Sequence, residues 1–421
     1  MTLSDLPLER GPGAGEAAPP RGLARRLVLA ALDRIEDGQL TLHEGGSRWC
    51  FGHPSRSLPH PAELQVGDPD FWRALMLDGT LGAAESWIRG GWSSPDLTSV
   101  LRVVLRNQTA MSQLDRPWTR LAGGTARRVW HMLRRNNRAG ARRNIHAHYD
   151  MGNELFELFL DPTLTYSCAL FETEEMSLEQ ASRAKYDRLC RRLRIGPADH
   201  VLEIGTGWGG FALHAASRYG CRVTTTTISD QQHALARERI ERAGLSERIR
   251  LLKEDYRDLT GTYDKLVSIE MIEAVGHQYF DTYLRTCARR LTPDGIFGLQ
   301  AITILDQRYE EAARSVDFIK RYIFPGGDLP SPSVLADVAR RATDFRICEL
   351  VDLTPHYVRT LQEWRDRFEK RLDDVYALGY DDAFVRTWLY YLAYCEAGFL
   401  ERNIGCHQIL FARPECRLGS I

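Results

Sequence analysis

The segment VLEIGTGWGG, residues 201–210, decides the fold class of this chain. The residues VLEI are typical of a buried strand, and the stretch FALHAASRYG after the glycines has helical spacing. Gly205 and Gly207 allow the backbone to turn tightly and to approach a ligand closely, while the helix presents its N-terminus. The segment therefore predicts a strand, a turn and a helix that together bind a ligand.

Strand and helix patterns alternate along the chain after this segment. Further strands are predicted at 221–228, 249–253, 264–269 and 295–303, with helices between them. This alternation predicts an α/β fold with a Rossmann-like, mostly parallel sheet that is covered on both faces. Ligands of such sheets bind beyond the carboxyl ends of the strands.

Four segments are predicted along the chain. Residues 1–22 are rich in glycine, proline and alanine and are expected to form a disordered leader. Residues 23–107 mix helix and strand patterns, which predicts a small α+β domain, assigned to lipid interaction. A basic connector spans 108–143. The catalytic domain is expected over 144–421, with a lid inserted at 303–335 where the alternation stops.

Composition excludes several classes of protein. The 55 Lys and Arg balance 56 Asp and Glu, so no global basic field recruits nucleic acid, and no nucleic-acid partner is expected. No apolar run approaches the roughly 18 residues of a spanning helix, and no secretion signal begins the chain, which predicts a cytoplasmic protein. The 9 cysteines form no C-x-x-C pair, so neither a disulfide framework nor a metal site is expected.

The connector carries a local positive charge. Nine arginines and no acidic residue lie within 116–143, and Val129, Trp130, Met132 and Leu133 are interleaved with them. Such a pattern favours a basic amphipathic segment on an anionic membrane surface, here the inner membrane face. A solvated linker helix is the alternative.

Two readings compete for the glycine-rich turn besides a merely structural turn. With Gly210 the spacing satisfies G-x-G-x-x-G, but no acidic residue ends the second strand to hold the ribose of a nicotinamide cofactor. That strand ends instead in Thr227-Ile228-Ser229. Glu203 and the segment EDYRDL at 254–259 are similar to class I methyltransferases, which bind S-adenosylmethionine.

A set of longer motifs resembles the cyclopropane-fatty-acyl-phospholipid synthase family over the whole chain after the leader. The N-terminal region contributes GTLGAAESWIRGGW at 79–92. The catalytic region contributes HYDMGNELFELFLDPTLTYSCALF (148–171), VLEIGTGWGGFALHAA, TISDQQ, EDYRDL, IEAVG (272–276), YIFPGGDLPS (322–331) and HYVRTLQEW (356–364).

The resemblance implies an activity. It implies transfer of the methyl(ene) carbon of S-adenosylmethionine to the cis double bond of an unsaturated phospholipid acyl chain. A carbocation is then deprotonated by bound bicarbonate, which closes a cyclopropane ring. It also implies a homodimer. The positions implied for bicarbonate and catalysis are Cys168, Glu273, Gln300, Ile302 and Tyr357. Those implied for the cosubstrate are Tyr149, Tyr166, Ser167, Glu203, Gly205, Gly207, Thr227, Gln232, Asp255 and Tyr256.

Two residues depart from the family pattern. Gln300 stands where the family has histidine, and a glutamine can donate a hydrogen bond but cannot relay a proton. Ala274 follows Glu273 where many members carry histidine. These departures motivate an alternative, a methyl- or methylene-branched product. A small-molecule O- or N-methyltransferase and a non-enzymatic lipid-binding protein are further alternatives. Glu270 competes with Glu273 as the site carboxylate and is ranked below it.

Overall fold

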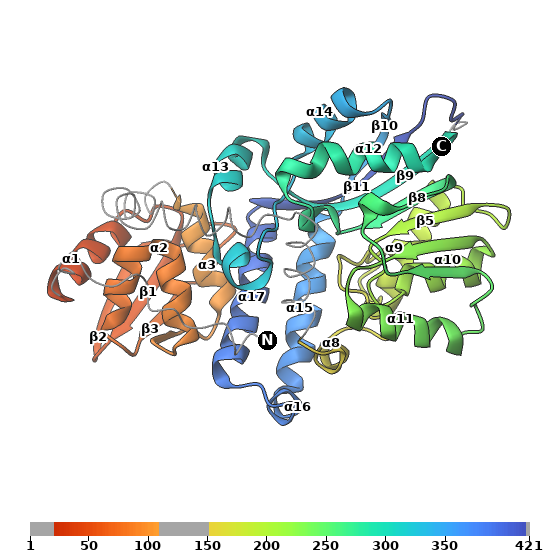
Figure 1. The fold of residues 1–421 in the computed structure, drawn as a ribbon. Helices are drawn as coiled ribbons and strands as arrows, with labels where there is room; N and C mark the ends of the chain where they lie inside the picture. Colours follow the sequence, from red (N-terminus) through yellow and green to blue (C-terminus); the bar gives the residue numbers. More distant parts are fainter. Residues whose placement is uncertain (1–20, 109–150, 418–421) are drawn as a thin grey trace. The chain divides into compact units, whose positions relative to one another are not determined.

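The chain divides into two units in the structure, a computed structural model that describes residues 21–108 and 151–417. Each unit has a sheet of its own (Figure 1). Among the described residues, the first unit holds 21–108, 316–323 and 375–403, and the second holds 151–315, 324–374 and 404–417.

The first unit combines helices with a four-stranded sheet. Its elements up to residue 108 are α1 (Arg21–Leu32), β1 (Gly38–Glu44), β2 (Ser47–His53), β3 (Ala62–Val66), α2 (Asp70–Ile88), β4 (Trp92–Ser93) and α3 (Leu97–Arg106). The strand order is β2-β1-β3-β4, and β1 is antiparallel to β2 but parallel to β3. Ala62, Leu64 and Val66 are buried while the residues between them are exposed, as expected for a strand with one face on a core. The small α+β region predicted from the sequence is confirmed.

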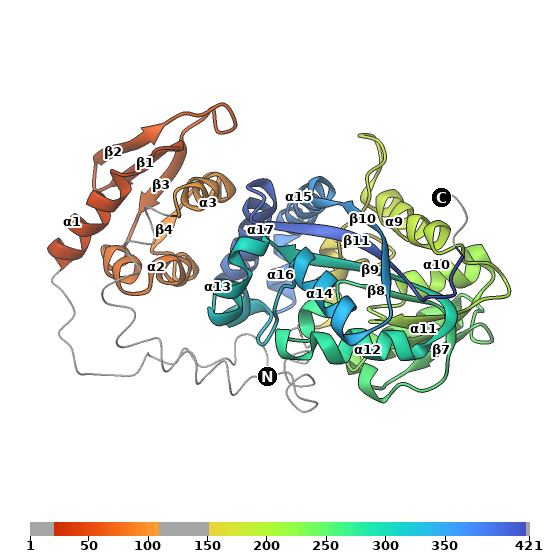
Figure 2. The same cartoon turned by 90° about the horizontal axis from the view of Figure 1, so that it is seen from above.

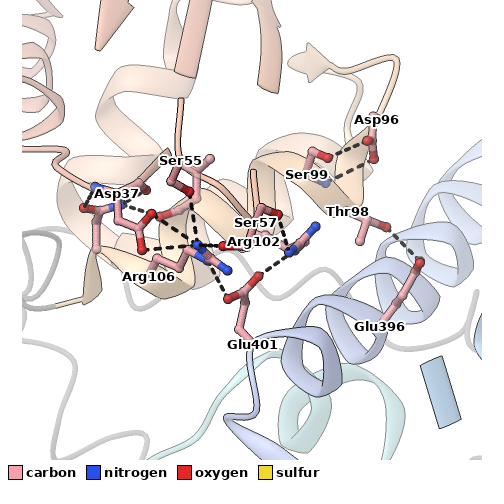
Figure 3. A network of polar contacts seen from close by, with 12 residues as sticks. Asp37, Ser55, Ser57, Asp96, Thr98, Ser99, Arg102, Arg106, Glu396 and Glu401 are labelled. Atoms are coloured by element: carbon pink, nitrogen blue, oxygen red, sulfur yellow. Dashed lines mark hydrogen bonds and ion pairs between the residues drawn. The ribbon is translucent and has the colours of Figure 1, made fainter. Parts of the chain in front are cut away.

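A late helix, α17 (Asp382–Leu400), completes the first unit by packing on α3 (Figure 3). The Thr98 hydroxyl donates a hydrogen bond to Glu396 Oε2 at 2.9 Å, and both residues are buried. The guanidinium Nε atoms of Arg102 and Arg106 donate to the two carboxylate oxygens of Glu401, at 2.6 and 2.5 Å. Because Glu401 is nearly buried, these charge-assisted bonds fix the end of the helix against α3.

This grouping differs from the domains expected from the sequence. Residues 375–403 were expected in the catalytic domain and residues 316–323 in the lid, whereas both segments pack with the first unit. The π-helical segment Ile319–Ile323 is preceded by Phe318, whose ring lies 4.7 Å from that of Tyr390 on α17. The aromatic ring of Tyr390 on α17 thus packs against the residue that precedes the π-helical segment.

The second unit is built on a seven-stranded sheet, in the order β10-β11-β9-β8-β5-β6-β7. Its strands are β5 (His200–Ile204), β6 (Arg222–Thr226), β7 (Ile249–Leu252), β8 (Tyr263–Ile269), β9 (Leu291–Ile304), β10 (Arg346–Asp352) and β11 (Ile404–Ala412). Neighbours from β9 to β7 run parallel, and β11 is antiparallel to β9 and β10. The predicted α/β class with a mostly parallel sheet is confirmed.

Apolar residues cover both faces of this sheet. Leu202 and Leu266 belong to a core formed with α12 and α14, whereas the adjacent Val201 and Val267 belong to a core formed with α9, α10 and α11. Figure 1 shows α12 and α14 on one side of the strands and α9 and α10 on the other, and Figure 2 gives the view from above. The helices of the unit are α8 (Asn153–Phe159), α9 (Leu178–Arg192), α10 (Gly210–Tyr219), α11 (Asp230–Arg242), α12 (Phe280–Arg290), α13 (Tyr309–Arg314), α14 (Pro332–Ala342) and α15 (Thr354–Lys370), with α16 (Leu372–Ala377) at its boundary.

Candidate functional site

The glycine-rich turn lies where the sequence places it, between β5 and α10. The backbone N–H groups of Gly205 and Thr206 donate to the carbonyl of Thr226 at 3.1 and 3.0 Å, which ties the turn to the end of β6. Gly205 and Gly207 have φ angles of +101° and +53°, in the region that favours glycine. A Cβ built on Gly207 would meet no atom of the described residues within 4 Å, so residues 21–108 and 151–417 leave open space at this point of the turn.

Glu203 stabilises the turn from within. Its Oε2 accepts a hydrogen bond from the Thr225 hydroxyl at 2.6 Å, and that hydroxyl also lies 2.6 Å from the hydroxyl of Thr206. Burial raises the pKa of Glu203 to about 8. The carboxyl group is thus a buried hydrogen-bonding partner of Thr225, and it positions the turn through the contact between Thr225 and Thr206.

The ends of β6 and β7 bring further predicted residues to the same edge of the sheet. After β6, the Thr227 hydroxyl donates to Gln232 Oε1 at 2.9 Å, and both side chains are buried. After β7, the Asp255 carboxylate accepts bonds of 2.8 and 2.6 Å from the Arg257 guanidinium. The hydroxyl of Tyr256 is buried and has no hydrogen-bond partner among the described residues. β6 runs parallel to β5 and β7 runs parallel to β6, so the carboxyl ends of the three strands lie at the edge of the sheet that carries the glycine turn.

An aromatic cluster joins Tyr166 to the turn. Its ring centroid lies 5.2 Å from that of Phe156, which lies 4.8 Å from the ring of Trp208 within the turn. On its other side the Tyr166 ring lies 5.1 Å from Trp364. Tyr149, the remaining aromatic residue predicted to contact the cosubstrate, lies outside the described residues.

A ring of donors surrounds the carboxylate of Glu270, which follows β8. Oε1 accepts hydrogen bonds from the backbone N–H of Cys168 at 2.9 Å and from Gln300 Nε2 at 2.7 Å. Oε2 accepts one from the hydroxyl of Tyr357 at 2.6 Å. Gln300 is oriented in turn by Gln408, whose Nε2 donates to its Oε1 at 2.9 Å. Three residues predicted for catalysis therefore all donate hydrogen bonds to Glu270, the carboxylate that the sequence analysis ranks below Glu273.

Glu273 and Ile302 form the second pair of the cluster. The backbone N–H of Ile302 donates to Glu273 Oε1 at 2.5 Å, so the two residues predicted to bind bicarbonate are bonded to one another. The residue keeps some exposed surface, but Oε2 is buried with no hydrogen-bond partner among the described residues. Burial, aided by the negative charge of Glu270, raises the pKa of Glu273 to about 8. Glu273 therefore holds its proton at neutral pH.

Comparison with known proteins agrees with this geometry. The family described as mycolic acid cyclopropane synthetase matches residues 136–409. The tuberculostearic acid methyltransferase UfaA1 of Mycobacterium tuberculosis is 40% identical over 359 residues, which cover 83% of each chain. The cyclopropane-fatty-acyl-phospholipid synthase of Escherichia coli K12 is 35% identical over 364 residues, covering 84% of this chain and 88% of that one.

A solved relative supports the same assignment. The mycolic acid cyclopropane synthase CmaA1, in complex with SAH and CTAB, is similar with a TM-score of 0.61 and 31% identity. The match covers 64% of this chain and 98% of that chain. This chain belongs to the cyclopropane-fatty-acyl-phospholipid synthase and mycolic acid methyltransferase family. It is an S-adenosylmethionine-dependent fatty-acyl methyltransferase or cyclopropane synthase family enzyme, as its sequence motifs predict.

One residue that this member of the synthase family buries was missed by the sequence analysis. Lys185 on α9 has no exposed surface, and its Nζ donates to Ser167 Oγ at 2.5 Å. Burial lowers the pKa of Lys185, while the charge of Glu270 opposes that change. The sequence does contain a signal for this buried lysine, because Lys185 shares the helical spacing of Leu178 and Leu189, which lie on the buried side of α9. A lysine at such a position needs a buried partner.

Replacing Glu273 with glutamine is expected to change how stability depends on pH. The pKa rises from an ordinary 4.5 to about 8 on folding, so the unfolded chain releases a proton between these values and the folded chain does not. The wild type should then lose up to about 1.4 kcal/mol of unfolding free energy per pH unit in this range through Glu273 alone. Urea unfolding from pH 5 to 8 should show the advantage of Glu273→Gln growing with pH. Parallel curves would contradict a buried, protonated Glu273.

Proposed function

We propose that this enzyme methylates the cis double bond of an unsaturated phospholipid acyl chain and produces a methylene-branched chain, the precursor of a methyl branch. The observation that carries the proposal is its likeness to a tuberculostearic acid methyltransferase, at 40% identity over 83% of both chains. Gln300 supports it, because both ends of its amide are hydrogen-bonded and it cannot relay a proton as a histidine does. The ring-forming mechanism implied by the family pattern uses that histidine.

The residues at the ends of β5, β6 and β7 are proposed to hold S-adenosylmethionine. The open space at Gly207, the N-terminus of α10 and the buried Thr227–Gln232 pair fit a nucleoside that approaches the backbone closely. The cosubstrate supplies a methyl group on a positively charged sulfur, and Tyr166 offers an aromatic ring suited to a neighbouring cation. The protein's task is to align the double bond and exclude water.

A branch that is fully saturated requires a second reaction. Methyl transfer followed by loss of a proton leaves one C=C bond in the product. Converting a methylene group to a methyl group adds a hydride and a proton, so a hydride-donating reductase must act on the product of this enzyme.

The substrate is proposed to be presented at an anionic membrane surface through residues 116–143, which lie outside the described residues. Within 21–108 and 151–417, no helix has both the length and the apolar character needed to cross a bilayer. Reaching an acyl chain then requires docking at the surface, and the arginines of 116–143 provide the charge for it. Location at the inner membrane face and homodimer formation remain predictions.

A cyclopropane ring is the second candidate product, since the Escherichia coli relative at 35% identity is named a cyclopropane-fatty-acyl-phospholipid synthase. One experiment separates the two. The purified enzyme is incubated with methyl-labelled S-adenosylmethionine and vesicles of monounsaturated phosphatidylglycerol or phosphatidylcholine, and the fatty acid methyl esters are analysed by mass spectrometry.

Both products are one CH₂ heavier than the substrate, so the esters are then hydrogenated under mild conditions. A methylene product takes up two hydrogens and a ring resists. Uptake supports the proposal, and a resistant product overturns it in favour of the ring. Faster labelling of the anionic vesicles supports docking through 116–143. An absence of labelled lipid from both would overturn the substrate class.

A further inference from the structure

The bicarbonate implied by the family resemblance does not fit the donors of this site. The N–H of Cys168, the hydroxyl of Tyr357 and the amide of Gln300 all donate to Glu270, at 2.9, 2.6 and 2.7 Å. The N–H of Ile302 is bonded to Glu273 at 2.5 Å. Each group that would hold the anion is already paired with a carboxylate of the protein.

We propose that the carboxylate of Glu270 replaces bicarbonate as the proton acceptor, so that this enzyme works without bicarbonate. Carboxylate and bicarbonate share the same chemistry, a planar anion with two oxygens that accept hydrogen bonds and can take up a proton. Glu270 places that anion among the donors predicted for bicarbonate. The inference rests on the proposed methylation of an acyl chain.

The backbone at Glu270 supports a functional role. Its φ angle is +49°, a left-handed conformation that costs a non-glycine residue free energy and that clusters at functional sites. The conformation is held because the Glu270 N–H donates to the carbonyl of Gln300 at 2.8 Å. The residue is only half-buried, whereas Cys168 and Gln300 have no exposed surface. Glu270 thus keeps exposed surface that Cys168 and Gln300 lack.

The other candidate proton acceptors in the cluster are unsuited to removing a proton from the methyl group. Glu273 has a pKa of about 8 through burial and holds its proton at neutral pH. The sulfur of Cys168 lies 3.2 Å from the carbonyl oxygen of Ala169 and 3.7 Å from that of Leu353, so its one thiol hydrogen has backbone carbonyls as acceptors. Burial raises the pKa of Cys406 well above its ordinary value.

The step balances with Glu270 as acceptor. The alkene π electrons form a bond from one alkene carbon to the methyl carbon of S-adenosylmethionine. The bond between that methyl carbon and sulfur breaks, and S-adenosylhomocysteine is released. The neighbouring alkene carbon is then a cation. A hydride moves from the methyl-bearing carbon to that neighbour. Glu270 then takes a proton from the methyl group, the C–H electron pair forms C=CH₂, and the proton later passes to water. Without the hydride shift, the same proton removal closes a ring, so the acceptor serves either product.

The test compares the wild type, Glu270→Gln and Glu270→Gly in buffer depleted of carbon dioxide and in the same buffer with bicarbonate. The measured quantity is the initial rate of label transfer to monounsaturated phosphatidylglycerol vesicles. The wild-type rate should change less than about twofold with bicarbonate. Glu270→Gln should be at least about 100-fold slower in both buffers, the size of a lost general base.

Glu270→Gly is the decisive variant. Glycine adopts the φ of +49° without strain, so the variant should fold, and it leaves the donors of Cys168, Tyr357 and Gln300 free to bind a small anion. Its rate should fall at least about 100-fold without bicarbonate and recover at least about tenfold when bicarbonate or formate is added. Calorimetric binding of S-adenosylhomocysteine checks that each variant is folded. Glu310→Gln, an exposed carboxylate on α13, is the matched control and should keep the wild-type rate.

Several outcomes would overturn the inference. A wild-type rate that falls about tenfold on removing bicarbonate would show that the anion is the base, and a Glu270→Gln rate equal to the wild type would show that Glu270 is not. A Glu270→Gly variant that neither bicarbonate nor formate rescues would contradict the claim that the Glu270 carboxylate occupies the place of the bicarbonate ion. A ring product made by the wild type without bicarbonate would overturn the branched product while supporting Glu270 as acceptor.

Discussion

Replacing Gly207 with alanine is expected to weaken the binding of S-adenosylhomocysteine at least about tenfold, or about 1.4 kcal/mol, without an unusual loss of stability. The part of the chain that the structure describes leaves open space around a Cβ at this position, so a loss of affinity is expected to come from a clash with the ligand itself. The backbone cost of alanine at a φ of +53° is about 1–2 kcal/mol.

The matched control is Gly244→Ala, after α11. Gly244 has a φ of +67°, and an added Cβ would again meet no atom of the described residues within 4 Å, so the stability cost should be similar and binding unchanged. Isothermal titration calorimetry gives the dissociation constants, and urea unfolding gives the stabilities. Equal affinities in the two variants would place the cosubstrate away from this turn.

Replacing Lys185 with methionine is expected to lower the free energy of unfolding by about 3 kcal/mol. The substitution preserves the apolar stem of this fully buried side chain but removes the positive charge that interacts with Glu270. The Ser167 hydroxyl then loses its buried donor, and the Glu270 carboxylate loses the influence of a nearby positive charge. Urea unfolding measures the loss.

A double-mutant cycle isolates the charge interaction. Lys185→Met combined with Glu270→Gln should lose clearly less stability than the sum of the two single variants, because the second change removes the unpaired charge. Ser167→Ala removes only the hydroxyl that accepts from Lys185 and should cost about 1 kcal/mol. Additive losses in the cycle would mean that Lys185 and Glu270 do not stabilise one another.

Local patterns were sufficient to predict the sheet and the glycine turn. The strands from β5 to β9 are runs rich in apolar and β-branched residues with turn signals beside them, and the helices between most of them favour a parallel order. The residues at the ends of β5, β6 and β7 then meet because neighbouring parallel strands end at one edge, which requires no knowledge of side-chain packing.

The ring around Glu270 could not be predicted in the same way. Its donors come from residues 168, 300 and 357, which tertiary packing alone brings together. Sequence reasoning placed the functional carboxylate at Glu273 because the resemblance supplies that position, and it ranked Glu270 lower. The packing of α17 on α3 could not be predicted for the same reason, since Thr98 and Glu396 are far apart in the chain. Such contacts depend on the fold as a whole.

The placement of α17 also affects the order in which the molecule can form during its synthesis. The strands of the first unit leave the ribosome early, but the helix that buries Glu396 and neutralises Arg102 and Arg106 is made near the end of the chain. Domains that are continuous in sequence fold as they emerge. Here the N-terminal unit must wait, incomplete, until nearly all of the catalytic sheet has been translated.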